Sequence, residues 1–189
     1  MTQALFKASE YASVASTTLR NTVLFNIVHI ENISKSKLNQ IEDWKEYYDP
    51  NRVSVDRLKN TNQKIIREIK DDDNEFTESR NINNNNVIYK LLLRDRGDNF
   101  AYAYEQEPLG FLRHGSPQAQ NTNTPLAIQL GGRLLVKQGA TVQRGVIFLT
   151  HNSCNYLGIH TDDRELVDTL NDGLAKKEID ILQKQLGSV

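Results

Sequence analysis

The sequence has one cysteine, Cys154, and no long apolar run. A single cysteine excludes an internal disulfide and cannot by itself build a cysteine-based metal site, so we expect a reducing compartment. No apolar segment approaches the roughly 20 residues that a membrane-spanning helix needs. The N-terminus, MTQALFKASEY, is polar and interrupted by charge, unlike a secretory signal. We therefore expect no association with a membrane.

The chain also lacks an excess of charge of either sign. Its 189 residues carry a formal net charge of -1, with 38% hydrophobic and 25% charged residues. These proportions are typical of a globular protein, and the length suits one domain with appendages. A net charge near zero argues against tight phosphate binding as the main activity, but it leaves room for a local basic patch.

Catalytic and metal-binding signatures are missing as well. Asp71-Asp72-Asp73 lacks the alternating ligands of a calcium loop, and Gly131-Gly132 is an ordinary bend rather than a phosphate-binding loop. The segment 160–163 is better explained as a helix cap than as a metal site. The other histidines are scattered: His29, His114 and His151. We expect no enzyme activity and no cofactor.

The stretch Arg133 to Ile159, RLLVKQGATVQRGVIFLTHNSCNYLGI, predicts two β-strands joined by a turn. Arg133 to Lys137 is the first strand and Val146 to Leu149 the second, with glycines at 139 and 145 bracketing the connection. Tyr156 to Gly158 are expected to lead out of the sheet. A hairpin this apolar needs other strands or a helix to cover it.

Three earlier segments can supply strands for that cover. Asn21 to Ile33 is apolar on both faces, which predicts a buried strand. Val87 to Arg94 and Phe100 to Glu105 predict a hairpin whose turn places Gly97 at positive φ. Residues 1–19 are only weakly helical, because they are rich in serine and threonine, and we expect a short arm there.

A long, partly helical insertion separates the first two predicted strands. One helix is expected from Ser36 to the break at Asp49-Pro50, and a second is capped by Ser54. The insertion ends in the polar tract Asn81 to Asn86, which is too polar to bury. Connections this long are uncommon in compact domains and are often functional. The apolar face of the first helix comprises Leu38, Ile41, Trp44 and Tyr48, and the stripe of the second comprises Val55, Leu58, Asn62, Ile65 and Ile69.

A C-terminal helix is expected from Thr161 or Asp162, with Asp162 and Glu165 at the spacing of a capping box and Gly173 as a weak point. Its apolar stripe comprises Leu166, Leu170, Leu174, Ile181, Leu182 and Leu186.

Together these segments predict a mainly β protein: a five-stranded barrel of the oligonucleotide-binding (OB) type, with the insertion between strands 1 and 2 and a C-terminal helix. A small β-sandwich would give similar strands. The predicted domains are an N-terminal helical arm at 1–20, an OB-fold domain at 21–160 containing the insertion 34–86, and the helix 161–189 packed on the barrel.

Two groups of side chains are candidates for binding on the predicted barrel. Phe100, Tyr102, Tyr104 and Phe148 can stack on nucleic-acid bases, but we favour core packing, because one parity of each barrel strand must face inward. Basic residues near strand ends suit a weak DNA patch or a protein interface: Arg94, Arg96, Arg113, Lys137 and Arg144.

A third group lies at the start of the insertion. Trp44, Tyr47 and Tyr48 are plausible anchors for a protein partner, since interfaces concentrate binding energy in such residues. Equally, Trp44 can cap the bottom of the barrel together with Leu38 and Ile41. Both readings can hold together, with Tyr47 facing outward.

Three segments, Leu24 to Ile41, Tyr89 to Leu112 and Leu130 to Ile159, resemble the RecQ-mediated genome instability protein 1 family. This family provides the OB-fold subunit that accompanies topoisomerase III and a RecQ helicase, and the asparagine tract resembles a fungal member. The resemblance implies a nuclear, non-catalytic scaffold in DNA repair, recombination and replication. Its partners would be topoisomerase III, a RecQ-family helicase and, weakly or through the complex, DNA.

The resemblance also implies that the insertion reaches toward the DNA gate of topoisomerase III and biases its opening, which supports dissolution of double Holliday junctions. Animal members carry a larger helical domain before the OB fold and a second OB domain after it, and we expect neither function here. The alternative is an OB module that binds single-stranded DNA directly through Arg94, Arg96 and Tyr102. The implied partner-binding residues are Trp44, Tyr47, Tyr48, Arg52, Val55, Leu58, Ile65 and Ile69.

Overall fold

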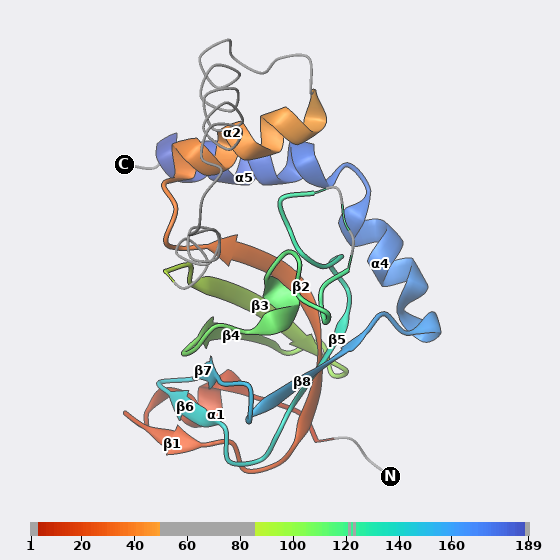
Figure 1. Ribbon diagram of the computed structural model, residues 1–189. Coiled ribbons are helices and arrows are strands. Elements are labelled where there is room, and N and C mark those ends of the chain that lie inside the picture. Colours follow the sequence, from red (N-terminus) through yellow and green to blue (C-terminus); the bar gives the residue numbers. More distant parts are fainter. Residues whose placement is uncertain (1–3, 50–85, 121, 123, 188–189) are drawn as a thin grey trace, which may run out of the picture. The chain divides into compact units, whose positions relative to one another are not determined.

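The computed structural model describes residues 4–49, 86–120, 122 and 124–187. These residues form two compact units. The first, residues 4–35 and 87–174, holds a curled, open β-sheet (Figure 1). The second, residues 36–49, 86 and 175–187, holds the helices α2 (Lys37–Tyr48) and α5 (Leu174–Gly187). The predicted second helix of the insertion, with Arg52, Val55, Leu58, Ile65 and Ile69, lies outside the described residues.

The sheet of the first unit has eight strands in the order β1-β6-β7-β4-β3-β2-β5-β8. All neighbouring pairs are antiparallel except β4 and β7, which run parallel. The strands are β1 (Thr17–Thr18), β2 (Val23–Asn32), β3 (Tyr89–Asp95), β4 (Phe100–Glu105), β5 (Arg133–Val136), β6 (Thr141–Gln143), β7 (Val146–Leu149) and β8 (Cys154–Gly158).

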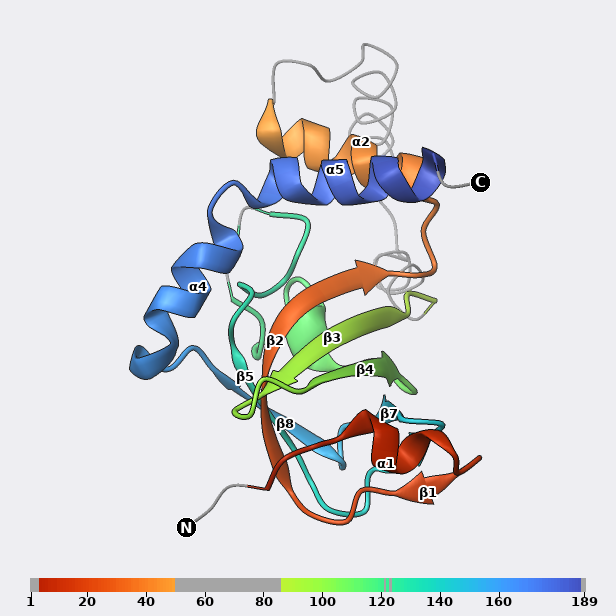
Figure 2. The same cartoon turned by 180° about the vertical axis from the view of Figure 1, so that it is seen from behind.

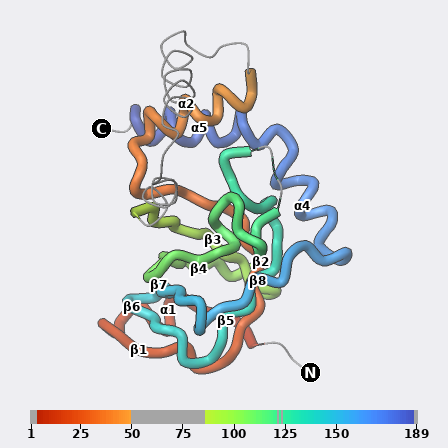
Figure 3. Tube along the Cα trace, viewed as in Figure 1, coloured from red at the N-terminus to blue at the C-terminus, as the bar shows by residue number. Residues whose placement is uncertain are grey.

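Five strands were predicted, and the described residues form eight, partly because the C-terminal hairpin is bent and its two arms are each interrupted. β5 pairs with β8 and β6 pairs with β7 in nearly continuous register. The path of the chain through these strands can be followed in Figure 3. The prediction that Arg133 to Lys137 pairs directly with Val146 to Leu149 is therefore wrong. Tyr156 to Gly158, expected to leave the sheet, belong to β8. The turn is Arg144-Gly145, with φ of 48° and 83°, which suits a two-residue hairpin loop.

The long strand β2 organises the core of the sheet. It pairs with β3 along most of its length and with β5 near its start, and a register shift between Ile27 and His29 bends it. Phe25 and Ile27 are fully buried. The other fully buried large side chains of the sheet strands are Leu91, Leu93, Leu134, Ile147 and Leu149.

The N-terminal segment, expected as an arm, is built into this core. Phe6 is 1% exposed; its ring stacks on Tyr11 of α1 (Ala8–Ala12) at 5.1 Å and meets the edge of Phe25 at 6.0 Å. The backbone N–H of Phe6 donates to Asp95 Oδ2 at 2.8 Å. Strand β1 then pairs with β6. Serine-rich composition lowered the helix expectation, but tertiary packing of two aromatic rings fixes the segment.

Asp95 also shapes the β3–β4 turn. Its Oδ1 accepts from the backbone N–H groups of Gly97 and Asn99 at 2.8 and 2.9 Å. The residue at positive φ is Asp98, at 60°, and not Gly97 as predicted. A Cβ at Gly97 would lie 2.9 Å from the end of the Leu5 side chain, which is 50% exposed and would have to shift.

The predicted C-terminal helix is two helices, α4 (Arg164–Asn171) and α5, preceded by the 3-10 turn η3 (Thr161–Asp163). The break falls at Gly173, whose φ of 59° suits the end of a helix. The predicted capping box is not formed. His160 Nδ1 accepts from the Asp162 N–H, and the Asp163 side chain at the start of α4 makes no capping hydrogen bond because its carboxylate accepts from Arg133 and Asn26. Of the predicted stripe, Leu174 and Leu182 are buried, while Ile181 and Leu186 are 37% and 39% exposed.

In the second unit, α2 and α5 lie side by side in both views (Figures 1 and 2). The Ser36 side chain caps α2 by accepting from Asn39 N–H at 3.2 Å. The buried side of α2 comprises Gln40, Ile41 and Trp44. Leu38 and Tyr48, predicted on that face, are 63% and 69% exposed, because the buried side is rotated toward Gln40. None of the helices in the described ranges is both long and apolar enough to cross a membrane.

Candidate functional site

The two ends of the long β2–β3 connection are joined at its root. Ile33 N–H donates to Ile88 O at 3.0 Å, and Ile88 N–H donates to Ser34 Oγ at 2.6 Å. Ser34 N–H in turn donates to Asn32 Oδ1 at 3.0 Å. The chain therefore leaves and re-enters the sheet at one point.

A buried ion pair supports the returning side of this root. Arg113, just after the short 3-10 helix η2 (Gly110–Leu112), contacts both oxygens of Glu105 at 2.9 and 3.1 Å and donates to Val87 O at 2.9 Å. Glu105 also accepts from the backbone N–H groups of Tyr89 and Leu109. The Arg113 guanidinium lies 5.0 Å from the centre of the Tyr89 ring. We call this set the Glu105–Arg113 clamp.

The clamp corrects the expectation for Arg113. Its side chain is 9% exposed, so it is not presented to DNA or to a partner as a surface cation. The sequence offered no direct signal for this pairing, although Glu105 continues the inward parity of Ala101 and Ala103 on β4. A carboxylate at an inward position must find a partner, since an unpaired buried charge is costly.

The aromatic residues of α2 divide between burial and exposure. Trp44 is 4% exposed, so it is not available as an anchor, and its ring meets Tyr47 edge-on at 6.3 Å. Tyr47 and Tyr48 are 42% and 69% exposed. These two tyrosines are the described residues of the insertion that suit an aromatic anchor for a partner.

The outer face of β4 carries the aromatic side chains that we expected in the core. Ala101 and Ala103 point inward and are buried, whereas Phe100 and Tyr102 are 54% and 49% exposed. Tyr104 is half-buried and stacks on Phe148 of β7 at 6.1 Å. The preference for core packing was therefore wrong: alternation defined two faces correctly, but the alanines are inside. We call Phe100, Tyr102, Tyr104 and Phe148 the outer aromatic face.

Cations border this face on β3. Cross-strand register pairs Arg94 with Phe100, Leu92 with Tyr102 and Lys90 with Tyr104. The ammonium of Lys90 lies 4.4 Å from the centre of the Tyr102 ring. Lys90 was not among the predicted residues, yet it shares the strand parity of Arg94, which is the signal that would have found it.

The other predicted cations do not join into one patch. Arg96 is exposed in the β3–β4 turn, and Arg144 is exposed in the β6–β7 turn, where its N–H donates to Val14 O. Lys137 follows β5, and its ammonium donates to Asn152 O at 3.1 Å. Of the predicted set, Arg94, Arg96 and Tyr102 come closest to one surface, because they share β3, β4 and the turn between them.

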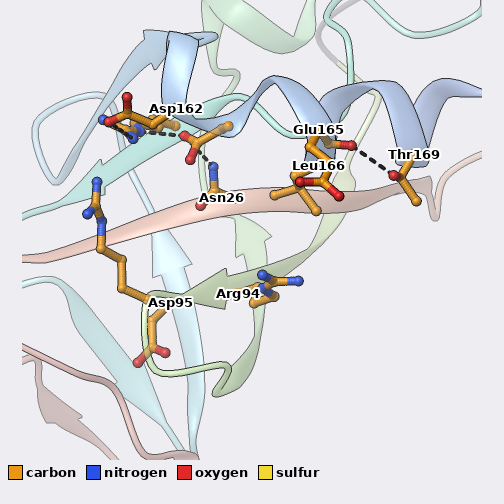
Figure 4. Close-up of a pocket in the computed structure, with 10 residues that line it drawn as sticks. Asn26, Arg94, Asp95, Asp162, Glu165, Leu166 and Thr169 are labelled. Atoms are coloured by element: carbon orange, nitrogen blue, oxygen red, sulfur yellow. Dashed lines mark hydrogen bonds and ion pairs between the residues drawn. The ribbon is translucent and has the colours of Figure 1, made fainter.

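A polar pocket of about 510 Å³ lies between β3 and α4 (Figure 4). Arg133 Nε donates to Asp163 Oδ2 at 2.5 Å, and Asn26 Nδ2 donates to the same oxygen at 3.1 Å. Burial alone would raise the pKa of Asp163, but the hydrogen bonds from Arg133 and Asn26 outweigh burial and lower it. The pKa of Arg133 is raised, chiefly by its hydrogen bond to Asp163.

This pocket has one more acidic than basic side chain in its lining. The three arginines are Arg94, Arg96 and Arg133, and the four acids are Asp95, Asp162, Asp163 and Glu165. Such a lining does not select an anion. No local sequence pattern indicates this pocket, because Arg133 and Asp163 meet only through the fold.

A smaller pocket of about 300 Å³ lies beside β8. Tyr156 stacks on Phe111 at 5.0 Å, and burial raises the pKa of its hydroxyl to about 12. Burial likewise raises the pKa of the Cys154 thiol to about 11. Neither group suits a nucleophile at neutral pH. No set of three or more His, Cys, Asp or Glu side chains within the described ranges is arranged to hold a metal ion.

A curled sheet whose β2–β3–β4 meander meets a bent hairpin, with β4 parallel to β7, defines an OB-fold domain. The family described as RMI1, N-terminal OB-fold domain, matches residues 6–168, and this chain belongs to that family.

A relative is RecQ-mediated genome instability protein 1 of Saccharomyces cerevisiae (strain ATCC 204508 / S288c), which is 28% identical over 155 residues. The match covers 72% of this chain and 58% of that protein, so the chain matches less than two thirds of the relative's length. Neither description names a catalytic activity. Family membership suggests a scaffold subunit in genome stability.

Proposed function

We propose that this chain is a non-catalytic nuclear scaffold that binds topoisomerase III. In this proposal the segment between β2 and β3 reaches the DNA gate of the enzyme and biases its opening and closing. With a RecQ-family helicase, the complex would dissolve double Holliday junctions. The proposal combines family membership with the position of the insertion in the fold.

The observation that carries the proposal is the fixed root of the insertion. A segment can transmit force or position to a partner only if its base is held, and here both ends are held. Ile33, Ser34 and Ile88 join the two ends by backbone and side-chain hydrogen bonds. The Glu105–Arg113 clamp then ties the returning end to β4 through Val87 O and Tyr89 N–H.

The exposed tyrosines of α2 supply a candidate contact. Tyr47 and Tyr48 expose much of their rings close to the point where the insertion continues. Tyrosine offers a large apolar surface and a hydroxyl at low entropic cost, which suits an interface anchor. We expect each to contribute more than about 1 kcal/mol to association if it lies at the centre of the interface.

The direct test replaces Arg52 to Asn86 by a short linker and measures co-purification with topoisomerase III together with decatenation. The sheet should still fold, since its described core lies outside that segment, and modulation of decatenation should change. If the shortened chain alters decatenation as the full chain does, the gate role is wrong.

A second variant separates docking from gating. Tyr47→Ala with Tyr48→Ala should weaken co-purification, whereas Ile181→Ala with Leu186→Ala, at 37% and 39% exposure on α5, serves as the matched control. Equal binding by both double variants would remove the two tyrosines from the interface.

A further inference from the structure

We propose that the outer edge of β8, together with the pocket beside it, binds an extended, uncharged segment of a partner polypeptide, which adds to the sheet as a further strand. The site consists of Cys154 to Leu157 on one side and Leu109 to Phe111 on the other. All of these residues belong to the first unit, so the site is complete without the helices α2 and α5. It is separate from the scaffold role and does not rest on it.

Strand β8 lies at one end of the sheet and pairs with β5 alone among the described strands. A strand at a sheet edge presents unpaired N–H and C=O groups, which form a template for another strand. Proteins commonly protect such edges with charged side chains or proline, and neither occurs between Asn152 and Ile159. The register with β5 shifts beside Leu157, and this bulge ends the regular edge. The edge that remains open to pairing is Cys154 to Tyr156.

The register between β5 and β8 fixes which backbone groups of β8 face outward. Lys137 N–H donates to Ser153 O at 2.8 Å, and Asn155 lies two residues further along the strand. Hydrogen-bonded and non-hydrogen-bonded positions alternate in an antiparallel pair, so Asn155 also directs its N–H and C=O groups to β5. Cys154 and Tyr156 therefore direct theirs away from β5. No backbone hydrogen bond from outside the β5–β8 pair reaches either residue within the described ranges.

The neighbouring pocket, of about 300 Å³, runs along this edge rather than over one face of the strand. Four consecutive residues of β8, Cys154 to Leu157, line it. Successive side chains of a strand point to opposite faces, so a pocket that touches all four follows the backbone edge. The other wall includes η2, from which Phe111 stacks on Tyr156 at 5.0 Å. An extended chain lying in this groove would meet the strand edge and an aromatic wall.

The side chains around the groove favour an uncharged occupant. The described lining contains no Asp, Glu, Lys or Arg, and Leu157 is 56% exposed. Burial raises the pKa of Tyr156 to about 12 and that of Cys154 to about 11, so both groups are neutral at pH 7. His151 at the rim is already paired with Glu107. A charged side chain in the groove would lose hydration without gaining a partner, whereas aliphatic side chains alternating with small polar ones fit it.

The test is an NMR titration of the full chain with a capped, uncharged heptapeptide, Thr-Val-Thr-Leu-Thr-Val-Thr. In the free chain, the amide hydrogen of Tyr156 should exchange with solvent faster than that of Asn155, which is bonded to β5. Bound peptide should slow exchange at Tyr156 about fivefold or more, because the added strand accepts from it, and should change Asn155 little. Absence of peptide binding, equal exchange at the two residues in the free chain, or unchanged exchange at Tyr156 with peptide bound would each overturn the proposal.

A charge at the edge tests the site from the side of the protein. Leu157→Lys introduces the protection that β8 lacks and should weaken peptide binding about tenfold or more. Phe100→Lys, at 54% exposure on β4 against 56% for Leu157, is the matched control and should bind the peptide as the wild-type chain does. Equal affinities of the two variants would contradict binding at this edge.

A modified peptide separates strand addition from simple apolar contact. N-methylation of its three central residues keeps every side chain but removes the N–H donors that a strand needs, so it should weaken binding about tenfold or more. Equal binding of both peptides would reject strand addition. Sedimentation of the free chain tests the other occupant: a concentration-dependent dimer in which Tyr156 is protected would assign the edge to a second copy of this chain and would overturn the proposal.

Discussion

On strands β3 and β4, charged side chains that face the core are buried, whereas those that face outward are partly exposed. The inward row of each strand ends in a buried carboxylate, Asp95 on β3 and Glu105 on β4, at 2% and 7% exposure. Asp95 fixes the N-terminal segment and the β3–β4 turn, and Glu105 fixes the root of the insertion. The outward row carries Lys90 and Arg94 in partly exposed pairs. The buried charges hold parts of the fold together, whereas the outward charges form pairs that remain partly exposed to solvent.

The largest expected difference between the two faces is in aromatic packing. Phe25→Ala should lower the free energy of unfolding by about 3–5 kcal/mol, because it opens a cavity beside Phe6. Phe100→Ala on the outer face should change it by about 0.5 kcal/mol or less. Urea denaturation of the two variants measures both values. A comparable loss in both would mean that the outer face is part of the core.

Breaking the Glu105–Arg113 clamp tests the buried charges. Arg113→Met leaves Glu105 buried without its partner and should cost about 3–5 kcal/mol of stability. Arg94→Met, which removes a partly exposed pair with Asp98, should cost about 1 kcal/mol or less.

The double variant Arg113→Met with Glu105→Gln completes this cycle. It should be more stable than Arg113→Met alone, since no isolated buried charge remains. Thermal unfolding at one pH is measured for the wild-type chain, Arg113→Met, Glu105→Gln and the double variant. A double variant less stable than Arg113→Met would contradict the desolvation argument.

Asp95 links stability to pH. Burial alone would raise its pKa, but hydrogen bonds from Phe6, Asn99 and Gly97 outweigh burial and lower it. Because the folded pKa lies below the unfolded value of about 3.9, the stabilisation is present above about pH 4 and is lost as pH falls through the folded pKa.

Asp95→Asn should therefore cost about 1–3 kcal/mol at neutral pH, because its amide N–H₂ would face backbone donors. The variant should also lose less stability than the wild-type chain as pH falls into the acid range. Asp163, whose pKa is also lowered, would contribute to the loss that remains. Unfolding temperatures between neutral and acidic pH provide the measurement, and an unchanged loss at acidic pH would contradict the role of Asp95.

Lys90→Gln should also have only a small effect on stability. The ion pair with Glu31 at 3.8 Å and the contact with Tyr102 are both partly exposed, so stability should fall by about 1 kcal/mol or less. A larger loss in urea denaturation would place Lys90 among the residues that hold the fold.

The hydrophobic periodicity of the sequence located most strands well but did not decide which face of each strand is buried. Phe100 to Glu105 was predicted with the bounds that β4 has, and Val23 to Asn32 falls within the predicted first strand. Alternation with period two separates two faces but does not say which is inside. We expected the parity that carries the rings to face inward, and the fold buries Ala101 and Ala103 instead.

The structure leaves some of the predicted binding residues on the surface and buries others. Those that remain candidates on the described surface are Tyr47, Tyr48, Arg94, Arg96 and Tyr102, and the role of each is still a prediction. Arg113 and Trp44 are buried. Single-residue chemistry cannot distinguish an arginine that is free to bind from one that neutralises a buried carboxylate, as Arg113 does with Glu105.

By itself, the sequence determined the elements that depend on neighbours along the chain: most strand segments, the start of a helix at Ser36, the weak point at Gly173 and the family pattern. These follow from local backbone preference and hydrophobic spacing. Only the tertiary structure decided the pairing of β5 with β8, the burial of Phe6, the partners of Asp95 and Glu105, and the outward turn of Tyr102. Those outcomes depend on which distant groups can be buried together at the lowest cost of desolvation, and sequence spacing carries no record of that competition.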